Sequence, residues 1–140
     1  MYAFLDRQVW QIEEPHRFLL AAMRNWVSAA RGGRCPCAAV AEGFVQRGVP
    51  LATRDFLMAM AALDRDGLGA LRFGARGCAC VSEDEARILG LFEAAMAGVP
   101  DRTRRIAATL VAEDAAGTLA TAAEWVGVHL GGGTFVERDA

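Results

Sequence analysis

Apolar residues recur at helical spacing through most of the chain, and glycine and proline separate one run from the next. In the clearest run, Phe56, Ala59, Met60 and Leu63 fall at the i, i+3, i+4, i+7 positions of one helix face. Strand signals are scarce, with few β-branched residues and almost no alternating runs. The pattern predicts an all-α fold, a compact bundle of about six helices.

Capping and helix-ending residues give the expected boundaries. Ser82 and Glu85 form a capping box that should open the fourth helix. We expect Thr53 to cap the third helix, whose segment 56–63 is apolar all round and is predicted to be the most buried. The glycines at 131–133 should end the last helix and leave a loose tail. The six expected helices start near Pro15, Ala38, Thr53, Ser82, Asp101 or Thr103, and Thr118, and the first four end near Gly32, Arg47, Asp64 and Gly98.

Composition excludes several classes of protein. The chain has 140 residues, of which 54% are hydrophobic and 23% charged, so we expect one globular domain over 1–140 rather than disorder. All 15 basic residues are arginine, and the net charge of −2 argues against a general nucleic-acid coat. The N-terminus lacks a secretory signal pattern and no segment is long and apolar enough to span a bilayer, so we expect a soluble cytoplasmic protein with no membrane partner.

The chain contains one internal echo. Residues 48–54 read Gly-Val-Pro-Leu-Ala-Thr-Arg and residues 98–104 read Gly-Val-Pro-Asp-Arg-Thr-Arg, each after a helix that follows a Cys-x-Cys. This predicts two pseudo-symmetric helical hairpins over 35–67 and 78–117, in which the first helix of the second unit is longer. The alternative is that Gly-Val-Pro is common helix-ending chemistry, since glycine terminates a helix and proline cannot continue it.

Four cysteines are the sharpest chemical feature. They form two pairs, Cys35-Pro36-Cys37 and Cys78-Ala79-Cys80, each on a short turn before a predicted helix. Four thiolates make a closed tetrahedral zinc site, and Zn²⁺ is the cofactor that we expect. Nearby arginines would offset its negative charge, namely Arg31, Arg34, Arg72 and Arg76. The sequence therefore predicts a small regulatory or protein-interaction domain stabilised by one structural zinc.

Other interpretations of the cysteines remain open. The pairs are consistent with a thiol-based redox switch, whose bridges would run between the two loops because a bond within Cys-x-Cys is strained. They are also consistent with inert buried thiols, or with an iron–sulfur cluster, although the usual cluster spacings differ.

The Gly-Val-Pro-x-x-Thr segments also outline a helix-turn-helix. The second one opens with a cluster of basic residues, Arg102, Arg104 and Arg105, and gives an alternative hypothesis of a DNA-binding regulator. The acidic net charge weighs against it.

Enzymatic signals are weak. Glu13-x-x-His16 has the spacing of a di-iron ligand pair, but the second copy that such bundles need is missing at His129. A catalytic pair of one cysteine with His16 or His129 needs a contact that sequence cannot supply, so we do not expect an enzyme. A protein partner or a homodimer is expected instead, with Trp10, Trp26 and Trp125 in the core or at an interface.

Overall fold

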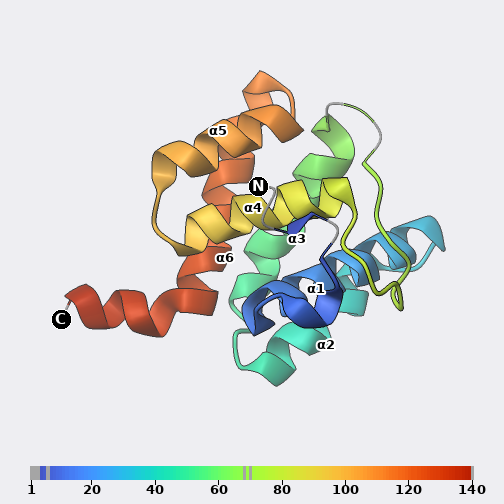
Figure 1. The fold of residues 1–140 in the computed structure, drawn as a ribbon, viewed down its shortest axis with the longest axis horizontal. Helices are drawn as coiled ribbons and strands as arrows, with labels where there is room; N and C mark the ends of the chain where they lie inside the picture. The colour runs from blue at the N-terminus through green and yellow to red at the C-terminus, as the bar shows by residue number, and fades with distance from the viewer. Residues whose placement is uncertain (1–3, 6, 68, 70, 140) are drawn as a thin grey trace.

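The protein is an all-α bundle (Figure 1). The computed structural model describes residues 4–5, 7–67, 69 and 71–139, with side chains as far as Gly131. Within these residues there is no strand and no helix long and apolar enough to cross a bilayer. The elements are a short 3-10 turn η2 (Val9–Gln11) and the helices α1 (Glu14–Arg31), α2 (Pro36–Arg47), α3 (Ala52–Asp66), α4 (Glu83–Met96), α5 (Pro100–Leu110) and α6 (Glu113–Asp139).

The predicted helix starts agree with the structure to within one residue for α1 and α4, whereas α2 begins two residues before the predicted start. Ser82 caps α4 as expected, with its hydroxyl accepting from the N–H of Glu85. By contrast, α2 begins at Pro36 and α5 at Pro100, because the fixed φ of proline suits the first helical turn. Thr53 is not a cap, since α3 already begins at Ala52.

The prediction that α6 ends at residues 131–133 is wrong. The helix starts at Glu113 and continues through the three glycines to Asp139. Figure 1 shows its C-terminal part turning away from the part that packs in the bundle. A glycine in right-handed helical conformation costs only about 1 kcal/mol relative to alanine, so glycine alone does not stop a helix.

Aromatic rings from four helices form the centre of the core. Phe18 of α1 meets Phe44 of α2 at 5.0 Å between ring centroids, and Phe44 meets Phe56 of α3 at 5.2 Å. Phe56 then stacks on Phe92 of α4 at 6.3 Å. The four rings therefore connect α1 to α4 through apolar contact, in geometries that aromatic pairs favour.

The most buried helix is α4 rather than α3. Every residue from Ile88 to Phe92 is buried, and α4 packs against α1, α5 and α6. The expected stripe of α3 does face the core, but Met58 and Ala61 on its other side are exposed. A helix whose sequence is apolar on all sides can therefore still expose one side to solvent.

Close packing against α4 depends on a glycine in α6. A Cβ placed on Gly127 would lie 3.0 Å from the backbone carbon of Ala95 and 3.0 Å from the nitrogen of Met96. The backbone of α6 thus rests directly on the end of α4, which a larger residue would prevent.

The two Gly-Val-Pro turns share one hydrogen-bond pattern. Gly48 donates to Val45 and Val49 to Phe44, while Gly98 donates to Ala95 and Val99 to Ala94. These pairs are Schellman motifs with a left-handed glycine. Gly33 and Arg34 make the same hydrogen bonds at the end of α1, although no Val-Pro follows them. The repeat hypothesis also attributes the wider spacing of the second unit to a longer first helix, but α4 has only two residues more than α2. The internal repeat stays a prediction.

Candidate functional site

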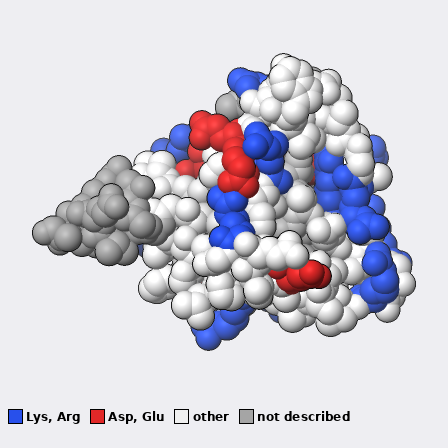
Figure 2. Space-filling view, turned by 90° about the horizontal axis from the view of Figure 1, so that it is seen from below, with Lys and Arg blue, Asp and Glu red and all other residues white. Residues whose placement is uncertain are grey.

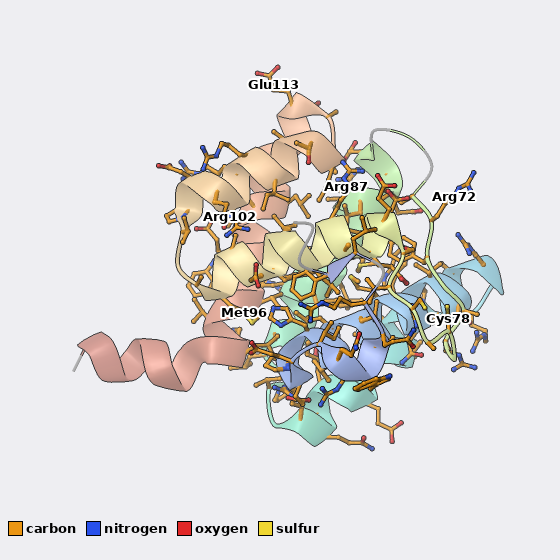
Figure 3. All side chains as sticks on the ribbon, in the orientation of Figure 1. Arg72, Cys78, Arg87, Met96, Arg102 and Glu113 are labelled. Atoms are coloured by element: carbon orange, nitrogen blue, oxygen red, sulfur yellow. The ribbon has the colours of Figure 1, made fainter. Side chains whose placement is uncertain are left out.

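All four cysteines are exposed and unbridged. Cys35 lies immediately before α2 and Cys37 in its first turn. Cys78 and Cys80 lie on the segment between α3 and α4, which we call the thiol loop (residues 71–82). Cys78 is labelled in Figure 3, where the thiol loop passes close to α1.

The thiols do not form a ready metal site. Among the described residues, no three His, Cys, Asp or Glu side chains lie close enough together to hold one ion. A tetrathiolate zinc centre requires all four sulfurs on one metal, so binding would need movement of at least one pair. The zinc site at Cys35, Cys37, Cys78 and Cys80 therefore stays a prediction.

A buried ion pair lies directly beneath the thiol loop. Nε of Arg24 in α1 donates to Glu85 of α4 at 2.7 Å, and Nη2 donates to the second carboxylate oxygen at 2.9 Å. The side chain of Arg24 is 3% exposed and that of Glu85 is 0% exposed. This bidentate geometry is the strongest form of arginine–carboxylate contact. It joins two residues that are 61 positions apart in sequence and lie on different helices.

Glu85 belongs to the capping box and to the ion pair at once. Its carboxylate accepts from the backbone N–H groups of Ser82 and Gly74, both at 2.9 Å, as well as from Arg24. Burial alone would raise the pKa of Glu85, but these hydrogen bonds outweigh it and hold the pKa below its usual value. Glu85 is therefore a charged, fully partnered group inside the protein.

Arg24 also holds the backbone on which the second thiol pair lies. Its Nη1 donates to the carbonyl of Cys78 at 2.7 Å and its Nη2 to the carbonyl of Cys80 at 2.8 Å. The hydrogen bond to Glu85 is the main cause of a raised Arg24 pKa, and burial opposes it. Gly74 permits the close fit, since a Cβ there would lie 2.9 Å from Nη2.

The thiol loop in turn holds the N-terminal segment, by which we mean residues 7–9. Val9 donates its N–H to the carbonyl of Ala79 at 2.6 Å, and Val81 donates to the carbonyl of Arg7 at 3.0 Å. Between them, the side-chain amide of Gln8 donates to Sγ of Cys80 at 3.3 Å. One cysteine sulfur thus participates directly in docking the N-terminal segment.

Basic side chains gather at the same end of the molecule. The four arginines predicted to flank the cysteines, Arg31, Arg34, Arg72 and Arg76, are all exposed. Figure 2 shows basic residues along the end where α1 finishes and the thiol loop lies. Arg104 and Arg105 of α5 are also exposed, while Arg102 approaches Glu93 at 3.8 Å. The DNA-binding hypothesis for these three residues stays a prediction.

No hydrogen bond joins a histidine to a thiol in the described part of the chain. His16 is buried against Phe4, with 4.9 Å between ring centroids, and its nitrogens have no hydrogen-bond partner among the described residues. His129 lies half-buried on α6. The Cys–His pair that nucleophilic catalysis requires is therefore not assembled here.

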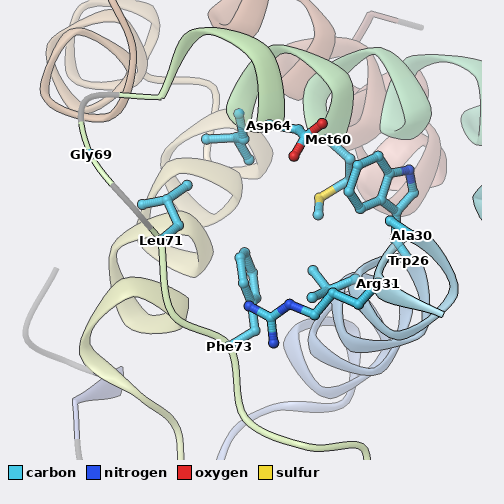
Figure 4. Close-up of a pocket in the computed structure, with 10 residues that line it drawn as sticks. Trp26, Ala30, Arg31, Met60, Asp64, Gly69, Leu71 and Phe73 are labelled. Atoms are coloured by element: carbon cyan, nitrogen blue, oxygen red, sulfur yellow. The ribbon is translucent and has the colours of Figure 1, made fainter. Parts of the chain in front are cut away.

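A small apolar pocket lies between α1, α3 and the thiol loop (Figure 4). Trp26, Met60 and Phe73 form its walls, with Arg31 and Asp64 at its edge. Its volume of about 240 Å³ is below the range of most ligand pockets. Trp26 is thus half-buried, whereas Trp10 and Trp125 are exposed at 72% and 52%.

Comparison with known proteins provides no family and no relative. No protein-family model matches the chain, and no curated protein or solved structure is similar to it. Function therefore has to be inferred from the site itself.

Sequence reasoning missed the ion pair at the centre of this site. The one local signal was a charge inside an apolar stripe, since Arg24 lies between Leu20 and Val27 on the buried face of α1. A charge in that position requires a buried partner. The sequence around its partner, Glu85, indicates only a capping box.

Proposed function

We propose that this protein is a thiol-based redox switch, in which oxidation of the thiol loop releases the N-terminal segment. The observation that carries the proposal is the hydrogen bond from Gln8 to the sulfur of Cys80, between two backbone bonds that join residues 7–9 to residues 79–81. A chemical change at that sulfur would directly disturb the hydrogen bond that helps to hold residues 7–9 on the thiol loop.

The reduced state has the features that a sensor needs. Both thiols of the loop are exposed, so a small oxidant reaches them without unfolding. The loop backbone is fixed on its inner side by the buried Arg24–Glu85 pair. Among the described residues, three hydrogen bonds join its outer side to the N-terminal segment, and these are the contacts that oxidation would break first.

The proposed reaction has two steps. Hydrogen peroxide transfers one oxygen to the thiolate of Cys80 to form a sulfenic acid, while the peroxide O–O bond breaks and the leaving hydroxide takes up a proton to become water. A thiol of the Cys35–Cys37 pair then attacks that sulfur, forming a disulfide and releasing a second water. The pairs are not gathered in the reduced protein, so this bridge requires one of them to move, and in the proposed switch it is residues 79–81 that move away from residues 7–9.

The test compares reduced and peroxide-treated protein. Peptide mass spectrometry should find a bridge between the two cysteine pairs, and amide hydrogen exchange should show lost protection at Val9 and Val81. Both changes should be reversed by a thiol reductant and be absent in the Cys78→Ser/Cys80→Ser double variant. The proposal is overturned if peroxide leaves the Val9 amide protected. It is also overturned if protein purified without chelator holds one zinc on all four thiols, which would favour the structural zinc domain.

A further inference from the structure

A groove lies beside the thiol loop, and the two steps proposed above assign it no ligand. It lies between η2, α1 and the loop and has a volume of about 620 Å³, within the range of small-molecule sites. We call it the Trp10 groove. Its lining residues are Val9, Trp10, Arg17, Leu20, Ala21, Arg24, Arg76, Gly77, Cys78 and Ala79.

The charge in the Trp10 groove has one sign. Three arginines line it, and no Asp or Glu does so. Arg24 is neutralised by Glu85, whereas Arg17 and Arg76 have no carboxylate partner among the described residues. Arg17 donates one N–H to the carbonyl of Ile12 at 2.5 Å, which fixes its side chain and leaves other donors unused. The groove is therefore complementary to carboxylates.

The remaining lining is an apolar floor with one reactive group. Leu20 and Ala21 of α1, the exposed Trp10 and Cys78 all line the groove. A ligand that fits these surfaces has carboxylates for the arginines, a short apolar body and a centre that reacts with a thiol. A small disulfide bearing carboxylates meets all three requirements.

We infer that the Trp10 groove binds a low-molecular-weight anionic disulfide and directs it to Cys78. This inference rests on the proposed redox function and names an oxidant class for it. The Cys78 thiolate attacks one sulfur of the ligand, a new S–S bond forms at Sγ, and the ligand's own S–S bond breaks. The leaving thiolate takes a proton from water. Cys78 is oxidised to a mixed disulfide and half of the ligand is reduced to a thiol.

The test uses three disulfides of similar size and different charge. Reduced protein at low salt is mixed with dithiodipropionate, which is anionic, with bis(2-hydroxyethyl) disulfide, which is neutral, or with cystamine, which is cationic. Mass spectrometry of the Cys78 peptide gives the rate of mixed-disulfide formation. We expect the anion to react about tenfold faster than the neutral compound and the cation to react slowest. About 0.5 M salt should reduce this preference, because it screens the arginines.

Matched variants locate the effect. Arg76→Gln should lose severalfold of the preference for the anion, and Arg76→Lys should restore part of it. Arg72→Gln removes the same charge from the same loop, but Arg72 projects away from Cys78 and does not line the groove (Figure 3), so its preference should be unchanged. Equal effects of Arg72→Gln and Arg76→Gln would overturn the inference.

The outcome also separates this inference from the switch itself. If peroxide forms the bridge between cysteine pairs but the three disulfides react alike at Cys78, the groove assignment fails and the switch stands. If the disulfides show the charge preference but peroxide leaves the N-terminal segment docked, the switch fails and the groove assignment stands.

Discussion

Arg24 lies within the apolar face of α1, where an unpaired charge would cost several kcal/mol. Four of its five N–H donors have acceptors, two on the Glu85 carboxylate and two on carbonyls of the thiol loop. A hydrophobic replacement of both partners could be equally stable, so the ion pair is best understood as a positioning device. It fixes where the Cys78–Cys80 backbone lies on the helix bundle.

Breaking this pair on one side should be strongly destabilising. Arg24→Met leaves a buried carboxylate with no cation and Glu85→Gln leaves a buried guanidinium, so each should lower the free energy of unfolding by about 3–5 kcal/mol. Urea denaturation measures the change. The control is Arg65→Gln, which breaks a pair with Asp66 whose arginine is 71% exposed and should cost less than about 1 kcal/mol. Similar losses in all three variants would contradict the assignment.

His16 should make stability depend on pH. Burial disfavours its charged form and lowers its pKa, against the opposing charges of Glu93 and Glu13. The unfolded chain takes up a proton near pH 6.5 while the folded protein resists, so the free energy of unfolding should fall as pH drops below about 6.5. Denaturation at about pH 7.5 and about pH 5.5 should show a loss in the wild type that is smaller in His16→Phe. Equal losses would show that His16 is not responsible.

At the scale of elements, glycine has two opposite uses in this chain. Gly48 and Gly98 take positive φ values in Schellman turns, where an L side chain is strained. Gly117 lies inside α6 without a positive φ, and a Cβ added to it would have no neighbour within 4 Å. The same residue type therefore ends α2 and α4 but merely weakens α6.

Substitution of these glycines by alanine should change the stability of the protein in opposite directions. Gly48→Ala and Gly98→Ala should each destabilise the protein by about 1–2 kcal/mol, because alanine is forced into the left-handed region. Gly117→Ala should raise stability by up to about 1 kcal/mol, because alanine favours the helix. Thermal unfolding compares the three variants. A stabilising Gly48→Ala would show that α2 does not end in the turn described.

Local signals predicted the elements better than the site. The capping box at Ser82 and the apolar stripe of α3 depend on residues within one or two turns, and both are confirmed. The predicted end of α6 was wrong because a run of glycines lowers the stability of a helix but does not by itself form the turn that ends one. The Arg24–Glu85 pair joins residues 61 positions apart, and no local pattern gives that pairing.

At the scale of the whole molecule, α6 completes the core. Its most extensive contacts are with α3, α4 and α5, while α1 packs mainly on α2. Leu119, Ala122, Ala123 and Val126 of α6 are all buried. The helices that carry the thiol loop at their ends, α3 and α4, are thus both covered by the last helix.

This arrangement gives the chain an order of assembly during synthesis. The α1–α2 hairpin can pack as soon as its own residues leave the ribosome, because its contacts are local in sequence. The faces of α3, α4 and α5 that pack on α6 stay uncovered until α6 is translated, since it is the last helix of the chain. Before α6 is made, the incomplete chain therefore exposes apolar surface that the finished protein buries, and it is the form that we expect to aggregate most readily.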